Sequence, residues 1–260
     1  MALLARWRAD QLVFEDTGGT NAAEDTDGVA SWGAYEGSQA GALAVQATGG
    51  NRPTYNASDG GYPSVSVVGA SSQRLTLAHS APWVLTAFSW LAAIKMTSAQ
   101  YRHIWGRGSA WTNAGCFLDG FTANMEFRCL YFHTGYLTRF SSLPKPDSTS
   151  TTWFVAAGIA DANKIEVYVN RQSVARVSQS NTVDFSTNPL TLFADGGGSA
   201  SYNMTGAARE FAFWDSALTG AEMQDEIDTV MDRWEITDTV TPPTSGTARP
   251  AHPMKSQVIG

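Results

Sequence analysis

The chain has 260 residues, 43% of them hydrophobic, and a formal net charge of −7. This acidic balance argues against nucleic-acid binding, which needs clustered Lys and Arg to neutralise phosphates. No apolar run is long enough to span a membrane, and the run in MALLARWRAD is too short for a secretory signal. We therefore expect a protein without membrane insertion, made and kept or assembled in a cytoplasm, with one large core.

The first quarter of the chain is irregular and rich in turns. A short strand is predicted at Leu12–Phe14, and it is followed in order by Trp32, Gln46 and the run Arg52-Pro53-Thr54-Tyr55. A pair of strands is then predicted within Pro63–Leu77, with Gly69 at the turn between them.

The middle of the chain predicts a series of strands. Trp83–Met96 carries apolar residues on both alternating faces, which is typical of a central strand covered on both sides. Turn residues then separate four shorter strands, which are predicted at Tyr101–Arg107, Gly115–Leu118, Met125–Phe132 and Tyr136–Phe140.

Cys116 and Cys129 are the only two cysteines. They flank a segment whose midpoint lies near residues 120–124, so a symmetric hairpin would place them directly opposite each other, within reach of a disulfide. Since the chain shows no secretory signal, we expect free buried thiols, the usual cytoplasmic state.

Thr152–Val177 predicts a three-stranded antiparallel meander. Apolar residues alternate from Trp153 to Ile159 and again from Ile165 to Val169. The connections are predicted at Asp161–Asn163 and at Asn170–Arg171, because Asn and Asp tolerate a left-handed backbone.

A further strand, a long closing strand and a helix follow. Leu190–Phe193 reads as a strand, and Gly206–Asp215 alternates so that Phe211 and Phe213 share one face. Thr219 and Glu222 have the spacing of a capping box at a helix N-terminus. An apolar stripe at helical spacing is formed by Met223, Ile227, Val230, Met231 and Trp234.

Three of these segments resemble laminin-G-like, concanavalin-type jelly rolls. They are the Trp153-led meander with its Tyr168-Val-Asn-Arg turn, the Pro63–Leu77 strands, and the closing stretch Glu210-Phe-Ala-Phe-Trp-Asp with its helix. The earlier ordered stretch of Trp32, Gln46 and Arg52-Pro53-Thr54-Tyr55 resembles the entry segment of bacterial and phage members of the same group. The resemblance covers roughly Trp7–Ile236 and implies an all-β fold, a two-sheet antiparallel jelly-roll sandwich with a C-terminal helix. Arg171 stands where this family usually has Gly, so a type I′ turn would be strained by about 1 kcal/mol. A wider loop would avoid that strain.

The chain accordingly divides into a sandwich, residues 1–236, and a C-terminal arm, residues 237–260. The arm holds four of the ten prolines and no aromatic residue, so it should extend rather than form a core of its own. We expect it to dock on a neighbouring protein through Pro242, Pro243, Arg249, Pro250, Pro253, Val258 and Ile259.

No catalytic residues are predicted. Glycosidases with this fold need closely spaced carboxylates, and the Glu-x-Asp-x-Glu pattern is absent. Glu166 and Glu210 stand alone on their strands, and the acids of the helix, Asp225, Glu226 and Asp228, are expected to form a solvated face. The histidines, His79, His103, His133 and His252, lack the spacing of metal ligands.

Two kinds of binding site follow from the resemblance. The family often holds a calcium ion at a loop edge, for which Asp119, Asp161 and Asp195 are the candidates, although each serves equally well as a turn residue. The fold also binds glycans on aromatic platforms. The candidates are Trp105, Trp111, Tyr131 and Tyr202, with a core or interface role as the alternative.

The resemblance and the missing catalytic spacing favour a non-enzymatic structural protein of a bacteriophage virion, either a capsid decoration or a tail or fibre module. In that hypothesis the chain is a homo-oligomer, and its arm docks it onto other virion proteins. The alternative is a carbohydrate-binding module, such as a receptor-binding adhesin that recognises a host-surface glycan. A glycoside hydrolase ranks third. No cofactor besides calcium is expected.

Overall fold

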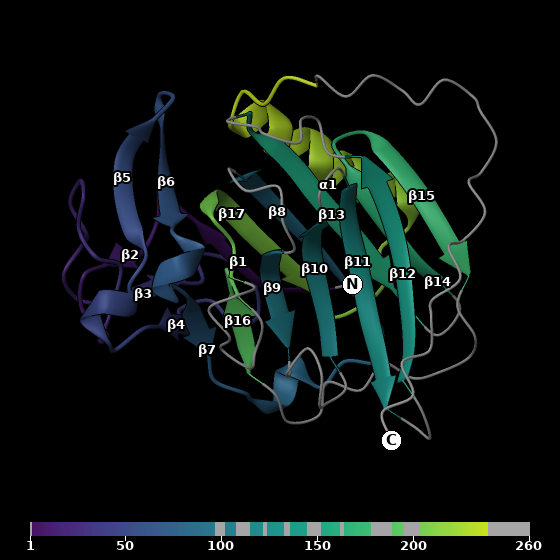
Figure 1. The fold of residues 1–260 in the computed structure, drawn as a ribbon, viewed down its shortest axis with the longest axis horizontal. Coiled ribbons are helices and arrows are strands. Elements are labelled where there is room, and N and C mark those ends of the chain that lie inside the picture. Colours follow the sequence, from purple (N-terminus) through teal and green to yellow (C-terminus); the bar gives the residue numbers. More distant parts are fainter. Residues whose placement is uncertain are drawn as a thin grey trace.

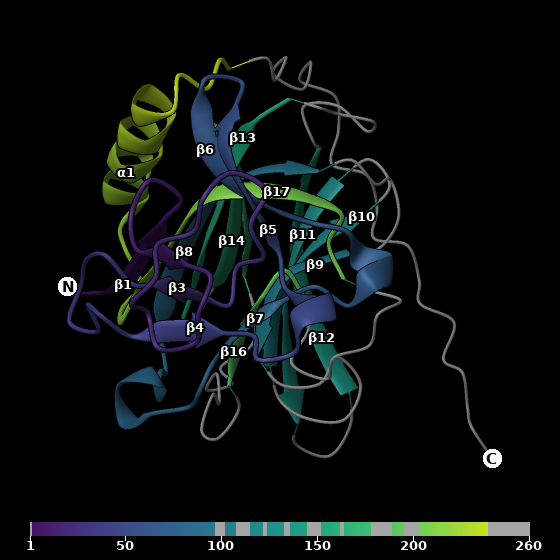
Figure 2. The ribbon, with the colours of Figure 1, turned by 90° about the vertical axis from the view of Figure 1, so that its left-hand side faces the viewer.

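The computed structural model describes residues 2–96, 102–107, 115–121, 124–132, 136–144, 152–161, 164–177, 189–194 and 203–238. Two antiparallel sheets pack face to face, and helix α1 (Gly220–Arg233) lies against the outer side of one of them (Figures 1 and 2). The predicted all-β sandwich with a helix near its C-terminal end is confirmed.

The helix-covered sheet has the order β15-β14-β13-β8-β17-β6-β5, and β1 also pairs with β17. Its strands are β1 (Leu3–Arg8), β5 (Thr54–Asp59), β6 (Tyr62–Val67), β8 (Phe88–Met96), β13 (Phe154–Ala160), β14 (Lys164–Val169), β15 (Gln172–Val177) and β17 (Gly206–Trp214).

The second sheet has the order β12-β11-β10-β9-β16-β7-β4-β3-β2. Its strands are β2 (Val13–Phe14), β3 (Ser31–Gly33), β4 (Leu43–Val45), β7 (Leu75–Leu77), β9 (Arg102–Arg107), β10 (Gly115–Phe121), β11 (Asn124–Phe132), β12 (Tyr136–Pro144) and β16 (Leu190–Leu192). Short 3-10 turns lie at Gly49–Asn51, Gly69–Ser71 and Ala81–Trp83.

Strand β8 is the central strand that its sequence predicts. It pairs with β13 on one side and β17 on the other. Trp90 and Ile94 belong to the core between the two sheets, whereas Leu91 and Ala93 belong to the cluster beneath α1. The strand begins at Phe88, because the predicted start at Trp83 is taken by a 3-10 turn that contains Pro82.

The closing strand β17 has the predicted alternation. Phe211 and Phe213 point into the core between the sheets, while Ala212 and Trp214 pack under the helix. The apolar stripe of α1 is buried in the same cluster, and the capping box of Thr219 and Glu222 is present. The helix is therefore fixed both by its cap and by its apolar face.

Strand β1, which sequence alternation did not predict, pairs with the C-terminal half of β17. Its apolar residues Ala5 and Trp7 face the core and alternate with Arg6 and Arg8, an alternation that covers only four residues. The N-terminal half of β17 pairs instead with β6. The first and last strands of the sandwich are thus neighbours.

The pair of strands predicted within Pro63–Leu77 exists as β6 and β7, but the two do not pair with each other. They belong to different sheets, and the 3-10 turn at Gly69–Ser71 carries the chain across. A side chain at Gly69 would collide with the backbone carbonyl of Asn203. Glycine is required there by this close approach.

The meander of β13, β14 and β15 is confirmed, and its second turn keeps two residues. Asn170 takes the left-handed conformation with φ of 51°, whereas Arg171 does not. The strain expected from Arg171 in a type I′ turn is thereby avoided without a wider loop. Separately, Cys116 and Cys129 are direct partners in the β10–β11 hairpin, as predicted.

Candidate functional site

A groove of about 500 Å³ opens beside β5 on the outer face of the helix-covered sheet. Lys95 lies two residues beyond Ala93, which packs under α1, so it emerges on the same side of the sheet as the helix. We call this feature the β5 groove. Its lining consists of Asn56, Ser58, Asp59, Gly60, Ser66, Val67, Val68, Lys95, Thr205, Gly206 and Ala207.

An irregularity in β5 brings two polar side chains of the groove together. Asn56 pairs with Ser64 and Asp59 pairs with Tyr62, so β5 has one residue more than β6 over this stretch. In a regular strand, residues three apart face opposite sides, but the extra residue of a bulge restores them to the same side. Ser64 confirms this, because its hydroxyl lies 3.4 Å from Asn56 Nδ2 and donates to Asp59 Oδ2 at 3.1 Å.

Asp59 and Lys95 form a half-buried ion pair in the groove. Lys95 Nζ lies 2.7 Å from each carboxylate oxygen of Asp59. The β5–β6 hairpin presents the carboxylate, since Gly60 and Gly61 take φ values of 67° and 90° in the turn that follows Asp59. The pair joins the edge hairpin to the central strand β8.

Arg209 lies next to the groove and holds part of its backbone in place. Its guanidinium carbon lies 4.1 Å from the ring centroid of Trp153, and its two terminal nitrogens donate to the backbone carbonyls of Asp59 and Trp234. Burial lowers the pKa of this guanidinium, which is 2% exposed. Arg209 therefore fixes the backbone of Asp59 to the end of α1.

A second pocket, of about 400 Å³, lies between α1 and the strands β1 and β17. Its lining consists of Leu3, Trp214, Leu218, Glu222, Asp225, Glu226 and Thr229. Glu226 is not simply solvated as predicted, because Arg6 Nη2 donates to it at 2.6 Å. Hydrogen bonds from the Thr219 hydroxyl and backbone N–H lower the pKa of Glu222. Two carboxylates of this pocket thus have structural roles.

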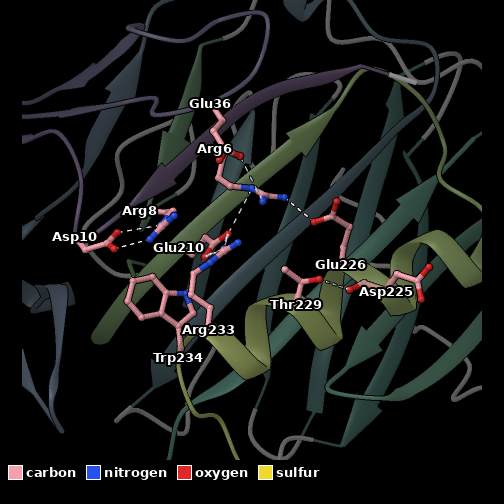
Figure 3. Close-up of polar contacts among 10 residues, drawn as sticks. All are labelled: Arg6, Arg8, Asp10, Glu36, Glu210, Asp225, Glu226, Thr229, Arg233 and Trp234. Atoms are coloured by element: carbon pink, nitrogen blue, oxygen red, sulfur yellow. Dashed lines mark hydrogen bonds and ion pairs between the residues drawn. The ribbon is translucent and has the colours of Figure 1, made fainter.

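Buried charges connect this pocket to the sheet (Figure 3). Glu210 on β17 accepts hydrogen bonds from Arg233 at 2.7 Å and from the Trp234 indole at 2.7 Å, and its other oxygen lies 3.4 Å from Arg6 Nε. These four residues come from β1, β17 and the end of α1. Their arrangement fixes the helix to the sheet, and their charges are paired with one another within the protein.

Sequence comparison decides the family. A family model described as the concanavalin A-like lectin/glucanases superfamily matches residues 69–224, more than half of the chain. The chain belongs to this superfamily. A search of curated protein sequences gave no match.

Solved structures similar to this superfamily member share its fold at low sequence identity. Domain 4 of AbnA, an extracellular GH43 arabinanase from Geobacillus stearothermophilus solved with arabinotriose, has a TM-score of 0.54 at 17% identity. That comparison covers 86% of this chain and 98% of the arabinanase domain.

Two toxin binding domains are also similar. The binding domain of Paraclostridial Mosquitocidal Protein 1 has a TM-score of 0.57 at 11% identity, with 89% of this chain and 53% of that one covered. The binding domain of botulinum neurotoxin serotype G has a TM-score of 0.52 at 13% identity, with 73% and 49% covered. This chain therefore spans about half the length of the toxin domains.

The predicted glycan platform is corrected at Trp105. This residue is 1% exposed in the core of the superfamily fold, with its ring centroid 5.6 Å from that of Trp90 and 5.2 Å from that of Phe213. A buried indole has no face open to a sugar, so Trp105 is a packing residue. Tyr131 lies on β11, opposite Leu137, and nothing further of its side chain is described. Trp111 and Tyr202 lie outside the described residues.

The predicted calcium ligands stay candidates, and the structure gives only the positions of two of them. Asp119 lies on β10 in the second sheet, Asp161 follows β13 in the helix-covered sheet, and Asp195 is outside the described residues. Within the part of the chain that the structure describes, no group of three or more His, Cys, Asp or Glu residues could hold a metal ion.

The docking residues predicted in the arm, from Pro242 to Ile259, lie outside the described residues. The described chain reaches Asp238, which is held at the β14–β15 turn. Asn170 Nδ2 donates to Asp238 Oδ1 at 3.3 Å, and Arg171 Nη1 lies 3.8 Å from Asp238 Oδ2. The helices of the described chain include none that is both long and apolar enough to cross a membrane.

The residues of the β5 groove were not predicted from the sequence. Asn56 and Asp59 are separated from Lys95 by more than thirty positions, and only the order of the sheet brings them together. One signal was available, because Lys95 is the only charged residue in a central strand that is apolar at every other position except Ser89. A charge in such a strand requires a partner nearby.

Proposed function

We propose that this chain is a non-catalytic carbohydrate-binding module and that sugar binds in the β5 groove. The observation that carries the proposal is the grouping of an amide, a carboxylate and an ammonium, from Asn56, Asp59 and Lys95, along one groove. Sugar hydroxyls both donate and accept hydrogen bonds, and fixed groups of both kinds are what a sugar site requires.

The structural neighbours support the carbohydrate hypothesis over the virion hypothesis. The arabinanase domain was solved in complex with arabinotriose, and the ligand binding domain of botulinum neurotoxin serotype D, similar at a TM-score of 0.52 and 12% identity, in complex with N-acetylneuraminic acid. At these identities the similarity concerns the fold alone. The ligands of the neighbours therefore favour carbohydrate as the class of ligand, and the position of the site rests on the residues of this chain.

The make-up of the groove supports binding without catalysis. A glycosidase needs two carboxyl groups, about 5 Å apart in retaining enzymes and about 6.5–9.5 Å apart in inverting ones. Among the described residues that line the β5 groove, Asp59 is the single carboxylate, and it is ion-paired with Lys95. A carboxylate held in this way is poorly placed to act as a nucleophile or a proton donor.

A glycan array tests the proposal. The purified chain should bind a defined set of immobilised oligosaccharides, and Ser58→Trp, which places an indole at an exposed position of the groove, should abolish that binding. Ala57→Trp is the matched control, because Ala57 is exposed but does not line the groove. Absence of binding to every sugar on the array would refute the proposed function.

The virion hypothesis remains as a second proposal, and one observation bears on where its docking arm would begin. Asp238 is bonded to Asn170 and lies near Arg171, so the chain leaves the described fold at a defined place beside the β14–β15 turn. In this proposal residues 239–260 attach the module to another virion protein or to a second copy. Deleting residues 239–260 should leave thermal stability unchanged and reduce the assembly size measured by light scattering. An unchanged assembly size would reject the docking role.

A further inference from the structure

The two charged side chains that line the β5 groove neutralise each other. Both oxygens of Asp59 lie 2.7 Å from Lys95 Nζ, which neutralises the pair. The neighbouring Arg209 is buried, and its two terminal nitrogens donate hydrogen bonds to the backbone carbonyls of Trp234 and Asp59. Among the described residues that line the groove, Lys95 and Asp59 are the only charged ones and they neutralise each other, whereas the buried Arg209, which does not line the groove, keeps its positive charge.

Hydrogen-bonding capacity nevertheless remains on these side chains. Two of the three N–H groups of Lys95 are directed to Asp59, which leaves the third for another acceptor. Asn56 uses its amide nitrogen on Ser66, at 2.9 Å, and its amide oxygen accepts nothing from the described residues. The described side chains that line the groove therefore offer donors and acceptors side by side, and their own charges sum to zero.

We infer that the β5 groove selects neutral sugars and excludes sialylated or other acidic ones. This inference rests on the proposed function and names the class of ligand. One hydroxyl of a neighbouring pair on the sugar donates to Asp59, and the next accepts from Lys95, so the ion pair receives a diol as a unit. An acidic sugar would bring its carboxylate beside Asp59, and like charges at close range repel.

The dimensions of the groove fit a short carbohydrate. Its volume of about 500 Å³ lies within the range of small-molecule sites, about 300–1,000 Å³. Val68, which is 52% exposed, adds apolar surface to the lining, whereas the Val67 side chain is buried in the core between the sheets. Such a surface can cover the C–H face of a sugar ring while the polar residues hold its hydroxyls.

The test uses matched pairs of neutral oligosaccharides and their sialylated derivatives on one array, followed by calorimetric titration of the best neutral sugar. The expected result is binding of neutral sugars at least about tenfold tighter than that of their sialylated partners, a difference of about 1.4 kcal/mol. Equal or tighter binding of sialylated sugars, when it is lost in Ser58→Trp, would overturn the charge inference and leave the proposed function standing.

Asp59→Asn tests the same inference by reversing the selectivity. The substitution keeps the shape of the side chain and leaves the charge of Lys95 uncompensated. It should therefore weaken the binding of neutral sugars at least about tenfold and allow sialylated sugars to bind. Asp228→Asn is the control, because Asp228 is also an ion-paired carboxylate, with Arg171 at 2.8 Å, at a more exposed position away from the groove. If the selectivity of Asp59→Asn matched that of the control, the ion pair would not select the ligand.

Two outcomes distinguish failure of the proposed function from failure of the proposed site. If no sugar of either kind binds the intact chain, the proposed function fails and the inference fails with it. If neutral sugars bind but Ser58→Trp has no effect, carbohydrate binding stands while the β5 groove is rejected as its site. Thermal unfolding of each variant shows that lost binding does not come from lost folding.

Discussion

Arg233 holds the buried carboxylate of Glu210, with Nη1 at 2.8 Å from one oxygen and 2.7 Å from the other. The Trp234 indole donates to the same carboxylate, and Arg6 of the first strand lies beside it. One side chain of the closing strand therefore joins the start of the fold to the end of its helix (Figure 3).

Glu210→Ala should destabilise the fold by about 3–5 kcal/mol, because it leaves the buried Arg6 and the half-buried Arg233 without their carboxylate. Urea unfolding at neutral pH measures the loss. Glu36→Ala is the matched control, since Glu36 is 41% exposed and lies 3.5 Å from the same Arg6. It should cost no more than about 1 kcal/mol. Similar losses in the two variants would contradict the account of the network.

Gly158→Ala should destabilise the sandwich by about 1–3 kcal/mol through overpacking. A Cβ at Gly158 would lie 2.6 Å from Cζ2 of Trp90, on the neighbouring strand β8. Gly50→Ala serves as the control, because a Cβ there meets nothing within 4 Å. Thermal unfolding should separate the two variants by several degrees, and an equally stable pair would show that Trp90 can move aside.

Thr219→Ala should remove the helix cap and cost about 1 kcal/mol at neutral pH. The Thr219 hydroxyl and backbone lower the pKa of Glu222, so the ionised Glu222 stabilises the fold above its unfolded pKa. That contribution disappears as the pH falls through the folded pKa. The difference between wild type and variant should therefore shrink in acid. A difference that is constant with pH would exclude the coupling between the two residues.

Asn170 performs two tasks that substitutions can separate. Its Oδ1 accepts from the N–H of Val155 at 2.9 Å, and its φ is 51°. Asn170→Gly removes the bond and keeps the backbone relaxed, whereas Asn170→Ala removes the bond and adds the strain of positive φ. The alanine variant should lose about 1–2 kcal/mol more in urea unfolding. Equal losses would mean that the hydrogen bond carries the whole effect.

Periodicity predicted those strands and the helix whose apolar faces alternate clearly. The two faces of β17 and the stripe of α1 follow directly from side-chain spacing. Strand β1 escaped prediction although Ala5 and Trp7 alternate with Arg6 and Arg8, because this alternation covers only four residues. Its polar face is buried by ion pairs, since Arg6 is 6% exposed beside Glu210 and Glu226.

The candidate site was harder to predict, because it depends on strand order and on a bulge. Nothing in the sequence says that β5 and β8 lie on either side of β17 and β6, or that an extra residue turns Asn56 and Asp59 to one face. Trp105 illustrates the opposite error. An aromatic residue beside turn-rich segments suggested a sugar platform, whereas the packing of the two sheets buries it.

The most direct test of the β5 groove is a nuclear magnetic resonance titration of the labelled chain with the neutral oligosaccharide that binds best on the array. The side-chain amide of Asn56 and the backbone amides of Ser66 and Ala207, which line the groove, should shift together and saturate with one affinity. Saturation of the protein with sugar while these resonances stay in place would contradict the claim that the β5 groove binds carbohydrate.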